Sequence, residues 1–218
     1  MRHTYWWTVL ICGVFFHANA FAENVAEVVG LKGEAVMLSA GKMTSLTVGA
    51  SVEEGAEVRT ANPGRIKLRF LDGSIIVVGD ASTLKIEKFY AGNKEAPRVG
   101  RFVLDIGLIS QTVAPSKKGS WVVRTPSAVT AVRGTEFIIE VKPDLETEVN
   151  VQSGAVAVEP MGRRMRGFIG GAGIKSPPVI VVDQQSHGTT CNTAAGCRMT
   201  EKANDDRLRV LADRLSGV

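Results

Sequence analysis

The sequence predicts an all-β protein of layered short strands, β-solenoid-like or jelly-roll-like in arrangement, with one C-terminal α-helix. Apolar residues alternate with polar residues over short stretches such as 66–70, which is the periodicity of a half-buried strand. The chain has 23 glycines, and several of them fall directly after such stretches, where tight turns are expected. Only the segment from about Thr200 to Leu215 has leucines at helical spacing.

Composition is that of a globular chain with one sizeable core. Of the 218 residues, 44% are hydrophobic and 22% are charged, which excludes an intrinsically disordered chain. The formal net charge of +4 comes from charges of both signs interspersed along the chain. We interpret this excess as a contribution to solubility, and the alternative is attraction to anionic lipid or polysaccharide.

The N-terminal 22 residues have the three parts of a secretory signal peptide. A basic start is followed by an apolar stretch, Tyr5 to Phe16, and then by small residues. Ala20 and Ala22 flank Phe21 in an A-x-A cleavage pattern, so we expect cleavage before Glu23, with a second site after Ala20. The alternative is an uncleaved anchor, but the apolar stretch is shorter than the ~20 residues that a spanning helix needs. The mature chain is therefore expected to be periplasmic or secreted and not to span a membrane.

The first strong hairpin signal lies at Asp72-Gly73. Ile66, Leu68 and Phe70 precede this dipeptide on one face of a strand, and the apolar run 75–78 follows it. Asp-Gly between two such runs favours a hairpin because both residues tolerate a positive φ. Asn62-Pro63-Gly64 is expected to form the turn that precedes this hairpin.

A second hairpin is expected between residues 136 and 152. Phe137, Ile139 and Val141 share one face of the first strand, and Pro143-Asp144 supplies the turn. The returning strand continues the apolar face. The opposite faces of both strands are expected to meet water, with these polar residues: Glu136, Glu140, Glu148, Asn150 and Gln152.

A short pattern, an apolar residue followed by two others and Gly-Ala, occurs at 46–50, 52–56 and 151–155. We interpret each copy as a strand end, a tight turn at the glycine and the next strand start. The segments 93–97 and 114–119 are expected to be exposed loops because both contain proline and charged residues.

Removal of the signal peptide would leave two cysteines, Cys191 and Cys197. An even pair in an oxidising compartment predicts a disulfide. The alternative is a metal site that uses His187 as a third ligand, although no fourth ligand is evident.

The composition changes after Pro160. Residues 161–173 carry three arginines among five glycines, which favours a loop, with a basic contact surface as the alternative. Residues 179–182 could form one more strand. In the C-terminal helix, Leu208, Leu211 and Leu215 share a face, so the helix is expected to dock on its own domain, or else to bind a partner.

Motifs for catalysis are absent from the sequence. After signal cleavage one histidine remains, His187, and it has no nucleophile motif such as G-x-S-x-G around it. The sequence contains no Walker loop and no H-E-x-x-H zinc motif. We therefore expect no catalytic residues, no metal site and no cofactor. Nucleic-acid binding is not expected, because aromatic and basic residues are not interleaved.

Residues 121–137 resemble the signature of the FecR-type domain family, which has Thr-Pro, a few small residues and then Ala-Val-Arg-Gly-Thr-x-Phe. The matching residues are Thr125, Pro126, Ala131, Val132, Arg133, Gly134, Thr135 and Phe137. Leu71-Asp72-Gly73-Ser74 upstream and Val151-x-Ser153-Gly154-x-Val156 downstream are also similar to the family pattern. The resemblance extends from about Val25 to Pro160.

The resemblance implies an all-β domain located in the periplasm. The family's best-known regulators relay the loading state of an iron–siderophore transporter to a cytoplasmic sigma factor, and the resemblance implies a function of this kind. Those regulators carry a cytoplasmic domain and a transmembrane helix before this domain, whereas here a predicted signal peptide precedes it. Arg133 is expected to be a buried or half-buried arginine at a turn, where it pairs with a carboxylate or with backbone carbonyls. The alternative is a direct functional role.

The expected organisation is a signal peptide at 1–22, a FecR-like β domain at 23–160 and a tail at 161–218 that holds the disulfide and the helix. The expected function is a non-enzymatic protein-interaction module in envelope signalling or scaffolding, with an envelope protein as partner. The alternatives are a module that binds carbohydrate or a surface polymer and a hydrolase that would need a carboxylate pair in a cleft.

Overall fold

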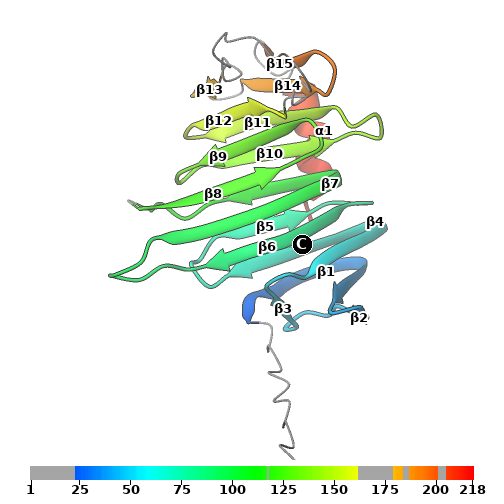
Figure 1. Cartoon of the computed structure of the whole chain (residues 1–218). Coiled ribbons are helices and arrows are strands. Elements are labelled where there is room, and N and C mark those ends of the chain that lie inside the picture. Colours follow the sequence, from blue (N-terminus) through cyan, green and yellow to red (C-terminus); the bar gives the residue numbers. More distant parts are fainter. Residues whose placement is uncertain (1–22, 117, 162–178, 184–186, 201–204) are drawn as a thin grey trace, which may run out of the picture.

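The computed structural model describes residues 23–116, 118–161, 179–183, 187–200 and 205–218, so the predicted signal peptide with Ala20 and Ala22 lies outside the described residues. These residues form fifteen strands and one helix (Figure 1). The strands are β1 (Asn24–Ser39), β2 (Lys42–Ser45), β3 (Ser51–Glu53), β4 (Glu57–Phe70), β5 (Ile75–Val78), β6 (Thr83–Tyr90), β7 (Arg98–Thr112), β8 (Gly119–Arg124), β9 (Ala128–Val132), β10 (Glu136–Val141), β11 (Thr147–Ser153), β12 (Val156–Pro160), β13 (Ile180–Val182), β14 (Gly188–Asn192) and β15 (Gly196–Thr200); the helix is α1 (Asp205–Leu215). The all-β class with a C-terminal helix is confirmed.

The strands belong to one hydrogen-bonded network that divides into two layers at β7. The first half of β7 pairs with β6 and, in parallel, with β8, and its second half pairs with β5 and β10. From this branch point β8, β9, β12 and β13 build one layer, and β10, β11, β14 and β15 build the other. Figure 1 shows the strands stacked along the molecule from β1 to β15. We call these the open layer and the helix layer, because α1 lies against the second.

Long strands can serve both layers because they bend in the middle. In β7 the bend falls at Gly107, which has a φ of 100°. A Cβ at this position would clash with Ser82, so both the backbone conformation and the space require glycine. In β4 it falls at 61–63, where three residues lie opposite the single residue Glu34 of β1, between the pairs Gly33–Gly64 and Ala35–Thr60. The prediction of a separate turn at Asn62-Pro63-Gly64 was therefore wrong. Proline, which lacks an N–H, is tolerated there because the ladder is interrupted.

The other predicted turns are confirmed. Asp72-Gly73 closes the β4–β5 hairpin, with the Phe70 amide donating to the Ser74 carbonyl at 2.9 Å. The glycine of each repeated Gly-Ala pattern, at positions 49, 55 and 154, has a φ between 83° and 88° and links two strands. The segment 93–97 connects β6 to β7 as a loop, and 114–116 and 118 lie between β7 and β8, while Gly119 is already the first residue of β8 and Lys117 lies outside the described residues.

The core lies between the layers and centres on four aromatic rings. Phe70, Phe89, Phe102 and Trp121 are each at most 2% exposed, and their ring centroids lie 4.6–6.3 Å apart. Trp121 Nε1 donates to Gln111 Oε1 at 2.7 Å, which joins β8 of the open layer to the second half of β7. Edge-to-face aromatic contacts and a paired indole N–H are the stable way to bury such a cluster.

The β10–β11 hairpin forms as predicted, and Glu136 on its second face is exposed as expected, but the middle of that face is buried. Ile138 is 1% exposed, Glu140 8% and Asn150 1%. The helix α1 covers the β10 part of this face, with Leu211 and Leu215 packed on Leu108 and Ile138. The expectation that Glu140 and Asn150 face water was wrong, because local alternation cannot show that a helix from the far end of the chain covers the strand.

The strands after Pro160 extend both layers. The expected strand at 179–182 is confirmed as β13, which pairs with β12, while the β14–β15 hairpin pairs with β11. The predicted division of the chain at Pro160 stays a prediction. Of the glycine- and arginine-rich segment 161–173, only Met161 lies within the described residues.

Among the described residues, no helix has both the length and the apolar character that crossing a bilayer would require.

Candidate functional site

The Thr-Pro part of the signature joins the two layers through buried hydroxyl groups. Thr125, Ser127 and Thr147 are at most 3% exposed. The hydroxyl oxygens of Thr125 and Thr147 lie 2.8 Å apart, and Ser127 Oγ lies 2.7 Å from Thr147 Oγ1 and 3.0 Å from the Cys191 carbonyl. The β8–β9 turn of the open layer is thereby attached to β11 and β14 of the helix layer. Half-buried Pro126 lies within this turn.

The Gly-Thr-x-Phe part of the signature attaches the β9–β10 connection to the β11–β12 turn. Thr135 Oγ1 donates to the Ala155 carbonyl at 2.9 Å, and Phe137 is fully buried in the core. Gly134 has a φ of 60°, a conformation that glycine adopts without strain. These signature residues therefore hold the ends of the strands in place.

Asp72 of the upstream signature holds a buried arginine that sequence reasoning missed. Asp72 accepts hydrogen bonds from the Ser74 amide at 2.9 Å and from the Ser74 hydroxyl at 2.8 Å. It also accepts one from Arg98 Nη1 at 3.0 Å, and the side chains of Asp72 and Arg98 are 6% and 4% exposed. Arg98 Nη1 donates as well to the Ala114 carbonyl, and its guanidinium lies 5.5 Å from the centre of the Trp121 ring.

Arg133 was expected to be the buried arginine, and this was wrong because its side chain is exposed. Arg98 holds the buried position instead. The sequence around Arg98 shows only a loop end after Pro97, so no local pattern could have indicated it. Arg133 lies at the end of β9, on the outer surface of the open layer, beside a shallow trough.

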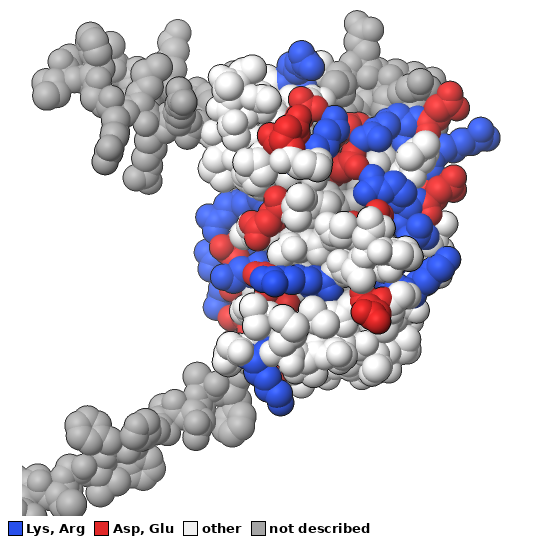
Figure 2. Space-filling view, turned by 90° about the vertical axis from the view of Figure 1, so that its right-hand side faces the viewer, with Lys and Arg blue, Asp and Glu red and all other residues white. Residues whose placement is uncertain are grey.

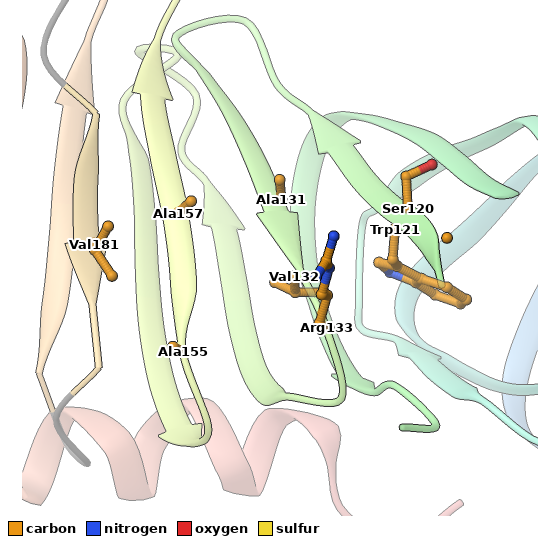
Figure 3. A pocket seen from close by; sticks show the side chains of 9 residues that line it. Ser120, Trp121, Ala131, Val132, Arg133, Ala155, Ala157 and Val181 are labelled. Atoms are coloured by element: carbon orange, nitrogen blue, oxygen red, sulfur yellow. The ribbon is translucent and has the colours of Figure 1, made fainter. Parts of the chain in front are cut away.

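This trough is the candidate site. Its volume is about 440 Å³, and Figure 3 shows its lining side chains coming from β8, β9 with the residue after it, β12 with the residue before it, and β13. Ala131 of β9 lies opposite Ala157 of β12, and Ala157 lies opposite Val181 of β13, so short side chains occupy adjacent strands. The lining residues are Gly119, Ser120, Trp121, Ala131, Val132, Arg133, Ala155, Ala157 and Val181.

The trough lies beside an open sheet edge. Within the described residues β13 pairs with β12 alone, and its side chain Val181 is 54% exposed while the preceding Val179 is 50% exposed. An edge strand offers unpaired N–H and C=O groups to another strand, and an apolar edge without a charge favours such pairing. The helix layer differs because α1 covers part of its outer face.

Charges of both signs lie near the trough, because Glu159 and Asp183 are exposed two residues beyond Ala157 and Val181. Arg133 and Arg101 are exposed and have no ion-pair partner within the described part of the chain. Arg124, also on this face, pairs with Glu87. Figure 2 shows one side of the molecule, on which Lys and Arg side chains are interspersed with Asp and Glu.

The tail contains the predicted disulfide and not the alternative metal site. Cys191 and Cys197 are bonded across directly opposed positions of β14 and β15. Both thiols are therefore used, and the alternative in which they would bind a metal with His187 was wrong. No cluster of three or more His, Cys, Asp or Glu side chains suited to a metal occurs in the described ranges.

Two layers of short strands joined through the long bent strands β4 and β7, with an open outer face on one layer, define a layered all-β module. Residues 56–157 match the family described as FecR protein. Two crystal structures of a candidate anti-sigma factor from Parabacteroides distasonis are similar in fold. Their TM-scores are 0.52 and 0.54 at 15% and 14% sequence identity, each over 71% of this chain. The matched part spans 64% and 63% of those two chains. No curated protein matches the chain.

Proposed function

We propose that this chain is a non-enzymatic protein-interaction module of the cell envelope, periplasmic or secreted, that acts in signalling or scaffolding. The FecR domain and the fold shared with a candidate anti-sigma factor support a regulatory role. The predicted signal peptide supports the compartment. The observation that carries the proposal is the trough beside the open β13 edge.

The surface fits an extended segment of an envelope protein. Backbone groups of β13 would extend the sheet by one strand, and the part of the segment next to that strand would cross the outer face and place small apolar side chains in the trough over Ala157 and Ala131. Arg133 and Arg101 would favour a segment that carries carboxylates at its outward-facing positions. Side chains from alternate positions of the added strand would meet this face, which provides sequence preference.

Carbohydrate binding is the weaker candidate. Sugar recognition on a β face would need an exposed aromatic platform, and Trp121 is 1% exposed in the core while Tyr90 is 36% exposed on β6. No feature of the described residues favours a hydrolase either. Recovery of polysaccharide is therefore one of the outcomes considered in the experiment below.

The test is photo-cross-linking in living cells, with a photoreactive amino acid at position 157 in the trough and, as control, at exposed position 213 on α1. We expect position 157 to yield one envelope protein by mass spectrometry, and we expect Ala131→Trp, which fills the trough, to remove that product. Recovery of the same products from positions 157 and 213, or of polysaccharide alone, would contradict the proposal.

A further inference from the structure

The helix α1 is held on the helix layer by few apolar contacts. Leu211 and Leu215 pack on Leu108 and Ile138, with Val77 beside them. This small cluster is separate from the main core, which lies on the other side of the same strands. An isolated helix of 11 residues is only marginally stable in water, so the order of α1 depends on this docking.

Charges determine where the helix lies. Arg207 and Arg214 stand seven residues apart, about two helical turns, and both reach Glu140 of β10. Arg214 also contacts Asp80 at 3.2 Å, and Arg207 contacts Glu148 of β11 at 3.2 Å. Two arginines are thus placed among three carboxylates that come from the β5–β6 connection, β10 and β11.

The three carboxylates are largely buried under the helix, and Lys142, which lies 3.7 Å from Glu148, is the basic group of the domain beside them. The side chain of Glu140 is 10% exposed, that of Glu148 14% and that of Asp80 23%. With the helix removed, the Arg207 and Arg214 contacts of Glu140 would be lost, and Leu108 and Ile138 would be exposed between the acidic groups. An apolar strip flanked by carboxylates is complementary to a basic amphipathic helix.

We propose that this face is a docking site for a basic amphipathic helix, and that its occupant in trans is the C-terminal helix of a second copy of this chain, exchanged for α1. The second copy has the required helix because its sequence is identical. The residues that share one face of this helix are Arg207, Leu211, Arg214 and Leu215. Exchange of an identical element needs no new interface, because every contact made within one chain is made again between two chains.

This site is on the opposite layer from the β13 trough, so it goes beyond the proposed function. Loss of the trough interaction would leave helix exchange intact. Loss of helix exchange would leave the trough photo-cross-link intact. The two failures are therefore distinguishable in the same set of variants.

Two complementary full-length variants test the exchange. In one, Arg207→Glu with Arg214→Glu makes the helix acidic, and in the other Glu140→Arg makes the face basic. Each variant alone repels its own helix, so both should be monomers whose C-terminal amides exchange hydrogen faster than in the wild type. When the two variants are mixed, the unaltered helix of the Glu140→Arg variant fits the unaltered face of the first variant. The acidic helix of the first variant fits the basic face of the Glu140→Arg variant. We expect a complex of twice the monomer mass by light scattering.

Arg209→Glu is the matched control because Arg209 lies on the exposed side of α1. Paired with the Glu140→Arg variant, it should give no mixed complex, because its helix is still repelled by the altered face. Near-ultraviolet circular dichroism of buried Trp121 checks that every variant is folded. In the wild type, mixing two populations with different fluorescent labels should produce energy transfer that rises with concentration. Folded complementary variants that remain monomeric together would overturn the proposal, as would wild-type chains that show no energy transfer.

Discussion

Arg98 donates to Asp72 across 3.0 Å inside the fold, and both side chains are more than nine-tenths buried. This pair connects the first residue of β7 to the turn between β4 and β5. Breaking one side of a buried ion pair leaves the other charge without compensation. We therefore expect Asp72→Asn to lower the free energy of unfolding by about 3–5 kcal/mol in urea denaturation.

The exposed pair of Arg69 and Glu27, with an N–O distance of 2.9 Å, provides the control for this prediction. Glu27→Gln should cost less than about 1 kcal/mol, because water solvates both partners after the change. If Asp72→Asn costs no more than Glu27→Gln, the Ala114 carbonyl and the Trp121 ring suffice to stabilise Arg98.

The hydroxyl of Thr147 is expected to stabilise the attachment of the layers. Thr147→Val would leave the Thr125 and Ser127 hydroxyls without one partner and should cost about 1–3 kcal/mol. Thr189 is the matched control, since its hydroxyl is fully buried and has no hydrogen-bond partner among the described residues. Thr189→Val should be neutral or stabilising in the same urea titration. Equal losses in both variants would contradict the role given to the hydroxyl cluster.

The bend of β7 is expected to require glycine at position 107. A Cβ there would lie 2.1 Å from Ser82 Oγ, and the φ of 100° is unfavourable for other residues. Gly41 has a φ of 77° with nothing within 4 Å of an added Cβ, so Gly41→Ala measures the conformational cost alone, about 1–2 kcal/mol. We expect Gly107→Ala to cost about 1–3 kcal/mol more than Gly41→Ala by thermal or urea unfolding. Similar costs would show that Ser82 moves aside freely.

Acid is expected to weaken the docking of α1 through Glu148. Burial of the Glu148 carboxylate acts to raise its pKa, but the hydrogen bond from Asn150 and the Arg207 guanidinium outweigh burial and hold the pKa below its ordinary value. A carboxylate with a lowered pKa stabilises the fold above its unfolded-state pKa of about 4.3, and this stabilisation is lost as the pH falls through the folded-state pKa. Protection of the α1 amides in hydrogen exchange should therefore fall below about pH 4.

Glu148→Gln supplies the comparison for this pH dependence. The variant should have weaker amide protection at neutral pH and a smaller further loss on acidification, because the titrating carboxylate is gone. A loss of protection in acid that is the same in the variant and the wild type would assign the effect to other groups.

Sequence patterns over a few residues predicted those features that depend only on neighbouring residues. Asp72-Gly73 and the three Gly-Ala turns were predicted because positive φ is a property of the residues at the turn itself. Alternation placed Phe137, Ile139 and Val149 in the core, since the side-chain period of a strand does not depend on its neighbours. The disulfide followed from an even cysteine count.

Contacts between distant segments were decided only by the tertiary structure. Glu140 was predicted to face water and is buried because α1 reaches it from residues 207 and 214. Arg98, not Arg133, is the buried arginine because Asp72 comes from a hairpin that lies 26 residues earlier. Asn62-Pro63-Gly64 lies inside a strand because β1 continues to pair on both sides of it. The trough exists because four strands place short side chains in register. The sequence by itself therefore determined turns, strand faces and class, whereas pairing across long sequence separations determined which charges are buried and which faces stay open.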